Sequence, residues 1–231
     1  TQGVLDFASR LEDTPLQALQ WGNLAVLKQT LGEHTEALHC AEQAMAKATG
    51  ENHEVTKAQA KRVMGEARTG LGELRGAFRD LNESLESSLN LHLVGNQIYV
   101  HNALGVTYRA AGRWEEAVEA HTTALDLAEK HGRRSGDAEI RTELGITYAA
   151  AGRYPEAAVE LERARTLAVE RGERHTAGRA TLALGALPAP TMAVGRAREL
   201  LREAEETFVE LGSAEAEQAR KALAGLPGPL N

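Results

Sequence analysis

The chain has 231 residues, of which 42% are apolar and only 4% aromatic, and its formal net charge is −7. This balance supports a sizeable core built from Ala, Leu and Val, and it argues against a basic surface that binds nucleic acid. A run of about 18 apolar residues and a signal-peptide pattern are both missing, and a single cysteine, Cys40, excludes a disulfide framework and a multi-cysteine zinc site. We therefore expect a cytoplasmic protein with no membrane span and no direct contact with nucleic acid.

A period of 40 residues orders the predicted elements along the chain. A large apolar residue followed by a small one marks the first half of each copy: Leu24-Ala25, Met64-Gly65, Leu104-Gly105, Leu144-Gly145 and Leu184-Gly185. An alanine marks the second half: Ala37, Ala77, Ala117, Ala157 and Ala197. Because apolar residues also recur at three- and four-residue steps, each copy predicts a pair of amphipathic helices.

In chain order, the pattern predicts about twelve helices. The first covers residues 3–11 and has the frame of a second helix; its Val4, Phe7 and Leu11 should cover a neighbour or remain partly exposed. We expect self-association through this N-terminal edge. Five helix pairs follow, starting near Pro15, Val55, Gly95, Gly136 and Thr176. They cover residues 15–54, 55–94, 95–135, 136–175 and 176–212, and a capping helix covers residues 215–226.

Glycines at fixed places separate and join these helices. Gly112 and Gly152 lie where first helices should end, and the ends of second helices are marked by Asn52, Gly132, Gly172 and Gly212. Gly and Asn suit these places because they tolerate the left-handed conformation that ends a helix. Gly105 and Gly145 lie inside first helices, where the second helix should approach so closely that no side chain fits.

Two copies depart from the common pattern. In the second copy, Arg68 replaces an aromatic residue and Ser84 replaces an alanine. In the fifth copy, Pro188 and Pro190 stand where the first helix should finish, so that helix should end near Ala186.

The copies resemble the tetratricopeptide repeat in a 40-residue form. The resemblance is clearest in Leu104-Gly105, Tyr108 and Gly112, and in their counterparts 40 residues on. It implies an all-α, right-handed α-solenoid with a single domain over residues 1–231. It also implies that first helices line a concave groove that binds a peptide or protein. The groove residues mapped from the resemblance are Asn23, Gln59, Arg62, Glu66, Tyr99, Asn102, Arg109, Glu139, Thr142 and Glu143.

Polar side chains in such a groove can hold an extended peptide. The amide of Asn102 could donate to and accept from a peptide backbone, Arg62 could pair with a carboxylate, and Tyr99 could supply contact area. Catalytic, cofactor and metal-binding motifs are missing from the sequence, and none of the eight histidines pair at the four-residue spacing of a helical metal site. We therefore predict a binding protein and not an enzyme, with no cofactor and no metal.

Two segments, Ala-Ala-Gly-Arg-Trp-Glu-Glu-Ala at 110–117 and Glu-Leu-Glu-Arg-Ala-Arg at 160–165, carry a second resemblance. Together with the repeat length, they resemble the C-terminal repeat regions of actinobacterial transcriptional regulators that carry a DNA-binding domain and a nucleotide-binding module. This resemblance implies a sensor or regulatory arm of a larger regulator. The alternative is a structural scaffold that holds oligomers together. The sequence leaves the ligand open, and it also leaves open whether the groove binds a separate partner or another domain of the same protein.

Overall fold

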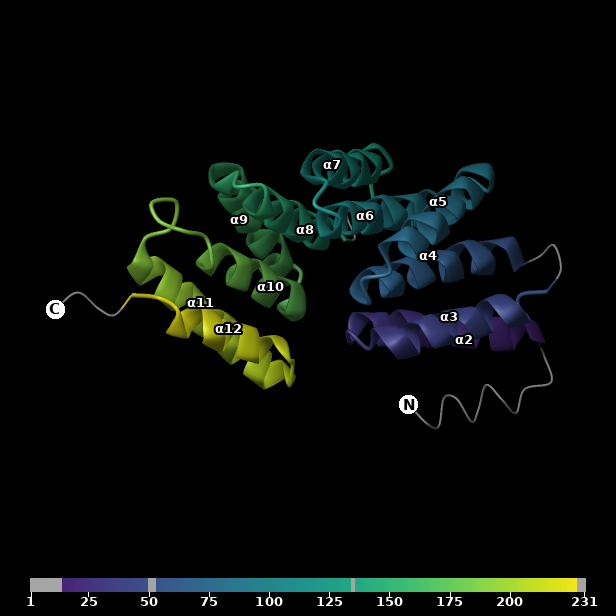
Figure 1. Ribbon diagram of the computed structural model, residues 1–231, viewed down its shortest axis with the longest axis horizontal. Coiled ribbons are helices and arrows are strands. Elements are labelled where there is room, and N and C mark those ends of the chain that lie inside the picture. Colours follow the sequence, from purple (N-terminus) through teal and green to yellow (C-terminus); the bar gives the residue numbers. More distant parts are fainter. Residues whose placement is uncertain (1–13, 50–52, 134–135, 228–231) are drawn as a thin grey trace. The chain divides into compact units, whose positions relative to one another are not determined.

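The computed structural model describes residues 14–49, 53–133 and 136–227, and these residues form eleven α-helices and no β-strand (Figure 1). The helices are α2 (Thr14–Thr30), α3 (His34–Lys47), α4 (Glu54–Gly70), α5 (Leu74–Asn90), α6 (Val94–Ala110), α7 (Trp114–Lys130), α8 (Asp137–Ala150), α9 (Tyr154–Glu170), α10 (Arg174–Gly185), α11 (Val194–Leu211) and α12 (Glu215–Ala224). The predicted all-α repeat fold is thus confirmed for the described residues.

The observed helix boundaries follow the 40-residue period closely. The five first helices begin within two residues of the predicted starts, and α10 ends at Gly185, one residue before the predicted Ala186. The predicted helix over residues 3–11 and the predicted helix end at Asn52 lie outside the described residues.

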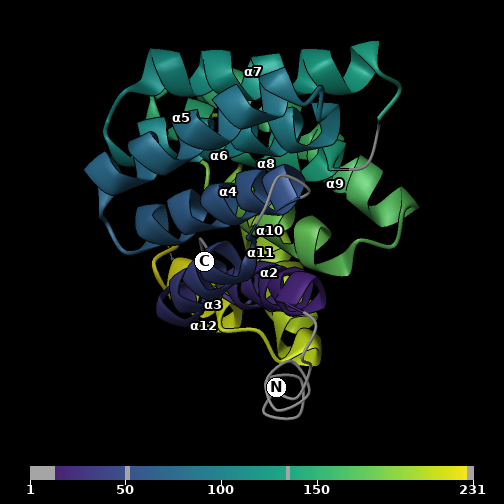
Figure 2. The ribbon, with the colours of Figure 1, turned by 90° about the vertical axis from the view of Figure 1, so that its right-hand side faces the viewer.

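The helices group into two compact units, residues 1–131 and 132–231. In unit 1, α2/α3, α4/α5 and α6/α7 form antiparallel pairs, and the first helices α2, α4 and α6 contact one another in order. Figure 2 shows this succession, with α7 at the top and the α2/α3 pair below. In unit 2, α8/α9 and α10/α11 pair in the same way, and α12 packs on α11 as the predicted capping helix.

Close packing in the second to fifth helix pairs depends on a glycine in the first helix. A Cβ atom added to Gly145 would lie 2.6 Å from Leu161 Cγ, and one added to Gly105 would lie 2.5 Å from the ring of His121. Gly65 and Gly185 face Leu81 and Leu201 in the same way. The prediction that Gly105 and Gly145 leave no room for a side chain is confirmed. His121 is the one exception among four equivalent positions that otherwise hold leucine.

The glycines at the helix ends adopt the left-handed conformation that the sequence predicted. Gly132, Gly172 and Gly212, which end second helices, have φ values of 62°, 70° and 65°. The equivalent residue of the second repeat is His92, with a φ of 53°. A side chain in this conformation costs free energy that glycine avoids, so His92 is a strained position that the period did not reveal.

In the third and fourth repeats, the turn between the two helices is closed by one backbone bond and one side-chain contact between the same two residues. In the third repeat, the N–H of Arg113 donates to the carbonyl of Tyr108 at 2.9 Å, and its guanidinium lies 4.5 Å from the Tyr108 ring centroid. Arg153 and Tyr148 repeat this arrangement, at 2.8 Å and 4.4 Å. The reversal of the chain brings residues five apart together, which allows the cation–π contact.

The first two repeats replace this cation–π contact by an ion pair. Lys28 pairs with Glu33, and the Arg68 guanidinium lies 3.6 Å from the Glu73 carboxylate. Arg68 also pairs with the buried carboxylate of Asp80. The replacement of the aromatic residue by Arg68 is thus accompanied by an acid, Glu73, at the position that holds arginine in the third and fourth repeats.

Candidate peptide-binding surfaces

The first helices of unit 1 present a row of accessible side chains. Leu19, Gln59 and Tyr99 occupy equivalent places in α2, α4 and α6, and all three are exposed, Tyr99 by 40%. Because α2, α4 and α6 contact one another in order, these side chains share one side of unit 1. We call this surface the unit 1 face; it consists of Leu19, Asn23, Gln59, Arg62, Glu66 and Tyr99. Leu19 is the one member that the sequence did not predict.

Arg62 lies at the centre of the unit 1 face and is held from three directions. Its Nε donates to the side-chain oxygen of Asn96 at 3.1 Å, and its Nη1 donates to the Glu66 carboxylate. The Tyr99 ring lies beside the guanidinium, with 5.4 Å between Cζ and the ring centroid. Nη2 makes no hydrogen bond to any described residue. The side chain is thus fixed in place while one of its donor groups stays available.

A buried polar cluster fixes Arg62 through Asn96. The Asn96 amide donates to Ser84 Oγ at 3.1 Å and to Ser88 Oγ at 2.7 Å. Ser84 in turn donates to the carbonyl of Ala58 at 2.6 Å, which ties α5 to α4. Ser84 interrupts the alanine pattern for this reason. The substitution was the sequence signal for the cluster, but it did not show that Asn96 would be the partner.

The structure places Asn102 in the interior of the α6/α7 pair and not on an open groove. Asn102 is only 8% exposed, and its side-chain oxygen lies 2.8 Å from Nδ1 of His121, which is fully buried. His121 occupies a leucine position, so its ring nitrogen needs a partner inside the core. The predicted role of Asn102 in holding a peptide backbone is therefore corrected, because its amide serves this buried contact.

Two further predicted groove residues of unit 1 differ in accessibility. Asn23 on α2 is exposed, whereas Arg109, one residue before the end of α6, is half-buried. The unit 1 face therefore contains five of the predicted residues, Asn23, Gln59, Arg62, Glu66 and Tyr99. Arg109 lies about two helical turns from Asn102 along α6.

The three remaining predicted residues belong to α8 of unit 2. Glu139 is exposed, but Thr142 is fully buried and its hydroxyl donates to the Ala138 carbonyl of its own helix at 2.7 Å. Thr142 is thus not presented to a ligand, which corrects its prediction as a groove residue. Glu143 is 5% exposed and pairs with Arg179 on α10.

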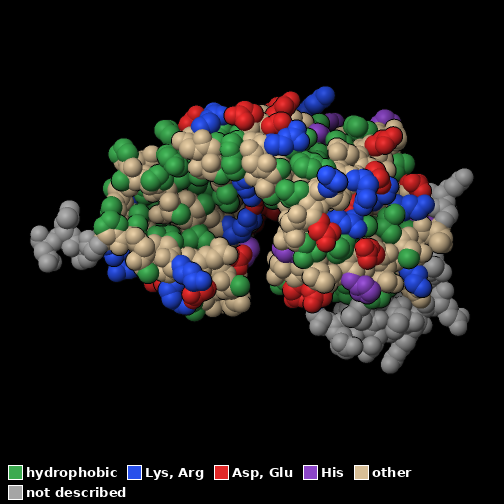
Figure 3. Space-filling view, in the orientation of Figure 1, with side chains coloured by type: hydrophobic (Ala, Val, Ile, Leu, Met, Phe, Trp, Pro, Cys, Tyr) green, Lys and Arg blue, Asp and Glu red, His purple; other side chains and the backbone are tan. Residues whose placement is uncertain are grey.

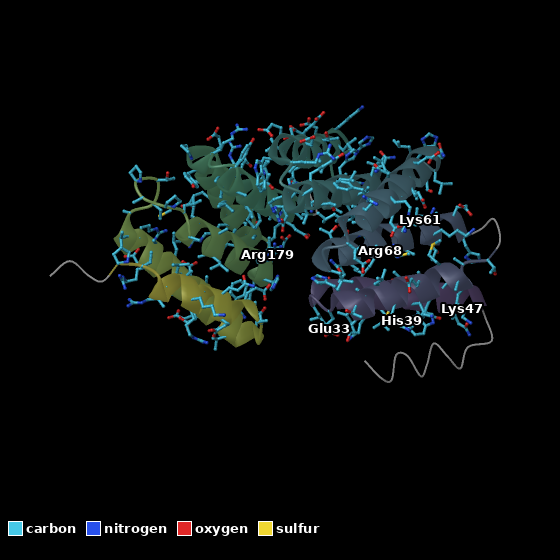
Figure 4. All side chains as sticks on the ribbon, viewed as in Figure 1. Glu33, His39, Lys47, Lys61, Arg68 and Arg179 are labelled. Atoms are coloured by element: carbon cyan, nitrogen blue, oxygen red, sulfur yellow. The ribbon has the colours of Figure 1, made fainter. Side chains whose placement is uncertain are left out.

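Arg179 is surrounded by carboxylates from two other helices of unit 2. The Glu143 carboxylate raises the pKa of the Arg179 guanidinium above its usual value, and Glu139 and Glu215 add to the same effect. Figure 4 shows Arg179 on α10. The sequence did not predict Arg179 as a site residue, although it stands in the frame of the exposed residues Tyr99 and Glu139.

Charges on the rest of unit 1 are mostly matched locally. Lys61 pairs with Glu83 at 2.8 Å. Arg68 lies where α4 faces α3 (Figure 4), and its guanidinium is close to the carboxylates of Glu42 and Asp80. In the view of Figure 3, blue and red side chains are interspersed over α4 and α5. Within the described ranges, no helix combines the length and the apolar character that crossing a bilayer requires.

Comparisons with known families agree with this geometry. Two family models, both described as tetratricopeptide repeat, match residues 22–53 and residues 96–186. No curated protein gives a significant sequence match.

Several solved structures share the fold at low sequence identity. The apo form of RapI has a TM-score of 0.68 at 15% identity, over 95% of this chain and 85% of that one. A Rap protein complexed with competence and sporulation factor has a TM-score of 0.68 at 18% identity, over 93% and 64%. A signal transduction ATPase from Pyrococcus horikoshii with a tetratricopeptide repeat sensor has a TM-score of 0.68 at 16% identity, over 93% and 34%.

The chain spans less than two thirds of the length of the last two of these proteins, and identities this low show the fold alone. Residues 22–53 and 96–186 are therefore tetratricopeptide repeats, and the helix pairs between and after them have the same fold.

Proposed function

We propose that this chain is a protein- or peptide-binding module and that its ligand lies on the unit 1 face. The observation that carries the proposal is the fixed guanidinium of Arg62 beside the exposed ring of Tyr99. Arginine and tyrosine dominate the binding energy of many protein interfaces. A guanidinium that is already held in place loses little conformational entropy when a ligand binds.

The chemistry of the unit 1 face favours a ligand with one acceptor group between apolar groups. Nη2 of Arg62 can donate to a carboxylate or to a backbone carbonyl. Tyr99 on one side and Leu19 on the other, 46% exposed, offer apolar contact. Three packed helices with interaxial distances of about 10 Å span roughly 20 Å, which is the length of about six extended residues.

We further propose that this module is the sensor or regulatory arm of a larger bacterial regulator of transcription. The fold similarity to a signal transduction ATPase that carries a tetratricopeptide repeat sensor supports this context. A Rap protein of the same fold forms a complex with competence and sporulation factor. Either a separate peptide or another domain of the same protein could occupy the unit 1 face.

The proposal is tested with a peptide selected from a random phage-displayed library on the wild-type protein. The peptide is titrated calorimetrically against wild type, Tyr99→Ala and Tyr154→Ala. Tyr154 is a matched control, because it is 36% exposed but lies at the start of α9 in unit 2. We expect Tyr99→Ala to weaken binding by about 1–2 kcal/mol, as for an interface hot spot, and Tyr154→Ala to leave it unchanged. Equal affinities for wild type and Tyr99→Ala would move the ligand away from the unit 1 face.

A structural scaffold is the second candidate function. Its support is the C-terminal end of α2, where Val26 and Leu27 are 42% and 48% exposed, together with Leu31 directly after the helix, which is 56% exposed. Exposed apolar residues grouped on one helix often contact another protein chain. Sedimentation equilibrium measures whether the protein self-associates as its concentration rises. A monomer at all concentrations would leave the binding module as the better description.

A further inference from the structure

An open cleft in unit 1 lies where α4 ends and α5 begins. Its volume is about 600 Å³. The charged residues that line it are Arg68, Glu73, Arg75 and Arg79, and Gly76 is also part of the lining. Three of these four charged residues are arginines. The cleft shares no residue with the unit 1 face, so the function proposed above makes no use of it.

One buried carboxylate holds two of these arginines in place. Asp80 is 4% exposed; one of its oxygens pairs with the Arg68 guanidinium, and the other accepts from Nε of Arg79 at 3.2 Å. Glu73 lies 3.6 Å from Arg68 as well. The charge of Arg68 is therefore offset by acids, and its side chain is only 14% exposed, whereas that of Arg79 is 62% exposed. Arg79 is thus oriented by Asp80 and still accessible.

Arg75 is the third arginine of the cleft and has no such partner. It is exposed and forms no hydrogen bond or ion pair with any described residue. Because Arg75 and Arg79 are four residues apart on α5, they lie on the same side of the helix, where like charges repel each other. The cleft therefore presents two accessible guanidinium groups, and an anion between them would relieve their repulsion.

The other repeats show that the fold does not require this positive charge. At the positions of Arg75 and Arg79, the third repeat has glutamates, Glu115 and Glu119. At the position of Gly76, the first, third and fourth repeats also have a glutamate, at 36, 116 and 156. A Cβ atom on Gly76 would lie 2.9 Å from Cδ of Arg68. In the second repeat the Arg68 side chain thus crosses the place from which the other repeats project an acid.

We propose that this cleft binds a phosphate monoester group, with Arg75 and Arg79 as its donors. Such a group carries a charge of about −1.5 to −2 at pH 7 and three acceptor oxygens, so it can bond to both guanidinium groups at once. A long acidic segment fits less well, because the chain has a net charge of −7 and carboxylates beyond the screening length of about 8 Å would gain nothing from the two arginines. A phosphorylated side chain of a partner protein and a small phosphorylated molecule both supply this group.

The test is a titration of the full chain with inorganic phosphate and with N-acetyl-phosphoserine amide at constant ionic strength. Binding is followed through the arginine Nε–Hε signals in ¹H–¹⁵N spectra, and wild type should show saturable shifts. Arg75→Glu/Arg79→Glu copies the third repeat and should bind about tenfold or more weakly, because it removes hydrogen bonds to a charged group. Arg163→Glu/Arg196→Glu is the matched control and should bind like wild type. It changes the net charge equally, on unit 2 side chains that are 61% and 48% exposed.

Arg75→Gln is a second variant that leaves the packing intact, since Arg75 is exposed and has no described partner. It should also weaken binding. Tighter binding of the phosphoserine amide than of inorganic phosphate would support the proposal with a phosphorylated protein as the source, and equal affinities would support it with a small phosphate. Shifts that do not saturate in wild type, an unchanged affinity of Arg75→Gln, or equal losses in the two double variants would overturn it.

Discussion

The contact between Asn102 and His121 predicts that Asn102→Ala destabilises unit 1. His121 is fully buried, and its Nδ1 lies 2.8 Å from the Asn102 side-chain oxygen. The substitution removes that oxygen from a site that water reaches poorly, since Asn102 is 8% exposed. Loss of a partner from a buried polar group costs about 1–3 kcal/mol. The free energy of unfolding should fall by that amount, whereas a residue that only faced a ligand would leave it unchanged.

The chain's own repeats supply the matched control. The fifth repeat has leucine at both equivalent positions, Leu182 and Leu201. Asn102→Leu/His121→Leu copies this combination and removes both polar partners together, which is often neutral or stabilising. Urea unfolding of wild type, Asn102→Ala, His121→Leu and Asn102→Ala/His121→Leu completes a double-mutant cycle. We expect a coupling energy of about 1 kcal/mol or more between the two sites. An unchanged midpoint for Asn102→Ala, or a coupling near zero, would refute the reasoning.

Three further predictions concern packing, backbone conformation and pH. Gly145→Leu should destabilise unit 2 by about 1–3 kcal/mol through overpacking against Leu161, and a wild-type melting curve would contradict it. His92→Gly should raise the free energy of unfolding by about 0.5–1 kcal/mol, because glycine tolerates a positive φ. The reverse change, Gly132→His, should lower it. If both substitutions shift the melting temperature in the same direction, this explanation is wrong. Burial lowers the pKa of His101, so the unfolded chain binds the proton more readily. Stability should therefore fall as pH drops below about 6.5, and His101→Gln should flatten the dependence of the urea midpoint on pH.

Most of the fold could be predicted from local signals. The 40-residue spacing of Leu104-Gly105 and Leu144-Gly145 predicted the helix pairs, because a helix pair with a small residue at its crossing point needs that residue at a fixed place. The glycines at helix ends predicted the turns, since the left-handed conformation is a property of the single residue. The positive φ of His92 could not be predicted in this way, because the residue is neither glycine nor asparagine.

The candidate site could be predicted only in part. Gln59 and Tyr99 share one frame, and both lie with Arg62 and Glu66 on the unit 1 face. That a ligand binds there stays a prediction. Asn102 occupies the same frame as Arg62, yet one is buried and the other is partly accessible.

For the described residues, the sequence by itself determined where the helices begin and end, because these boundaries depend on residues within one or two turns. Only the tertiary structure decided which partner each polar side chain contacts. His121, 19 residues further along the chain, draws Asn102 into the core, and Asn96, 34 residues away, holds Arg62 in place. A polar group can satisfy itself with solvent, a ligand or another part of the chain, and only the packed structure shows which partner lies within reach.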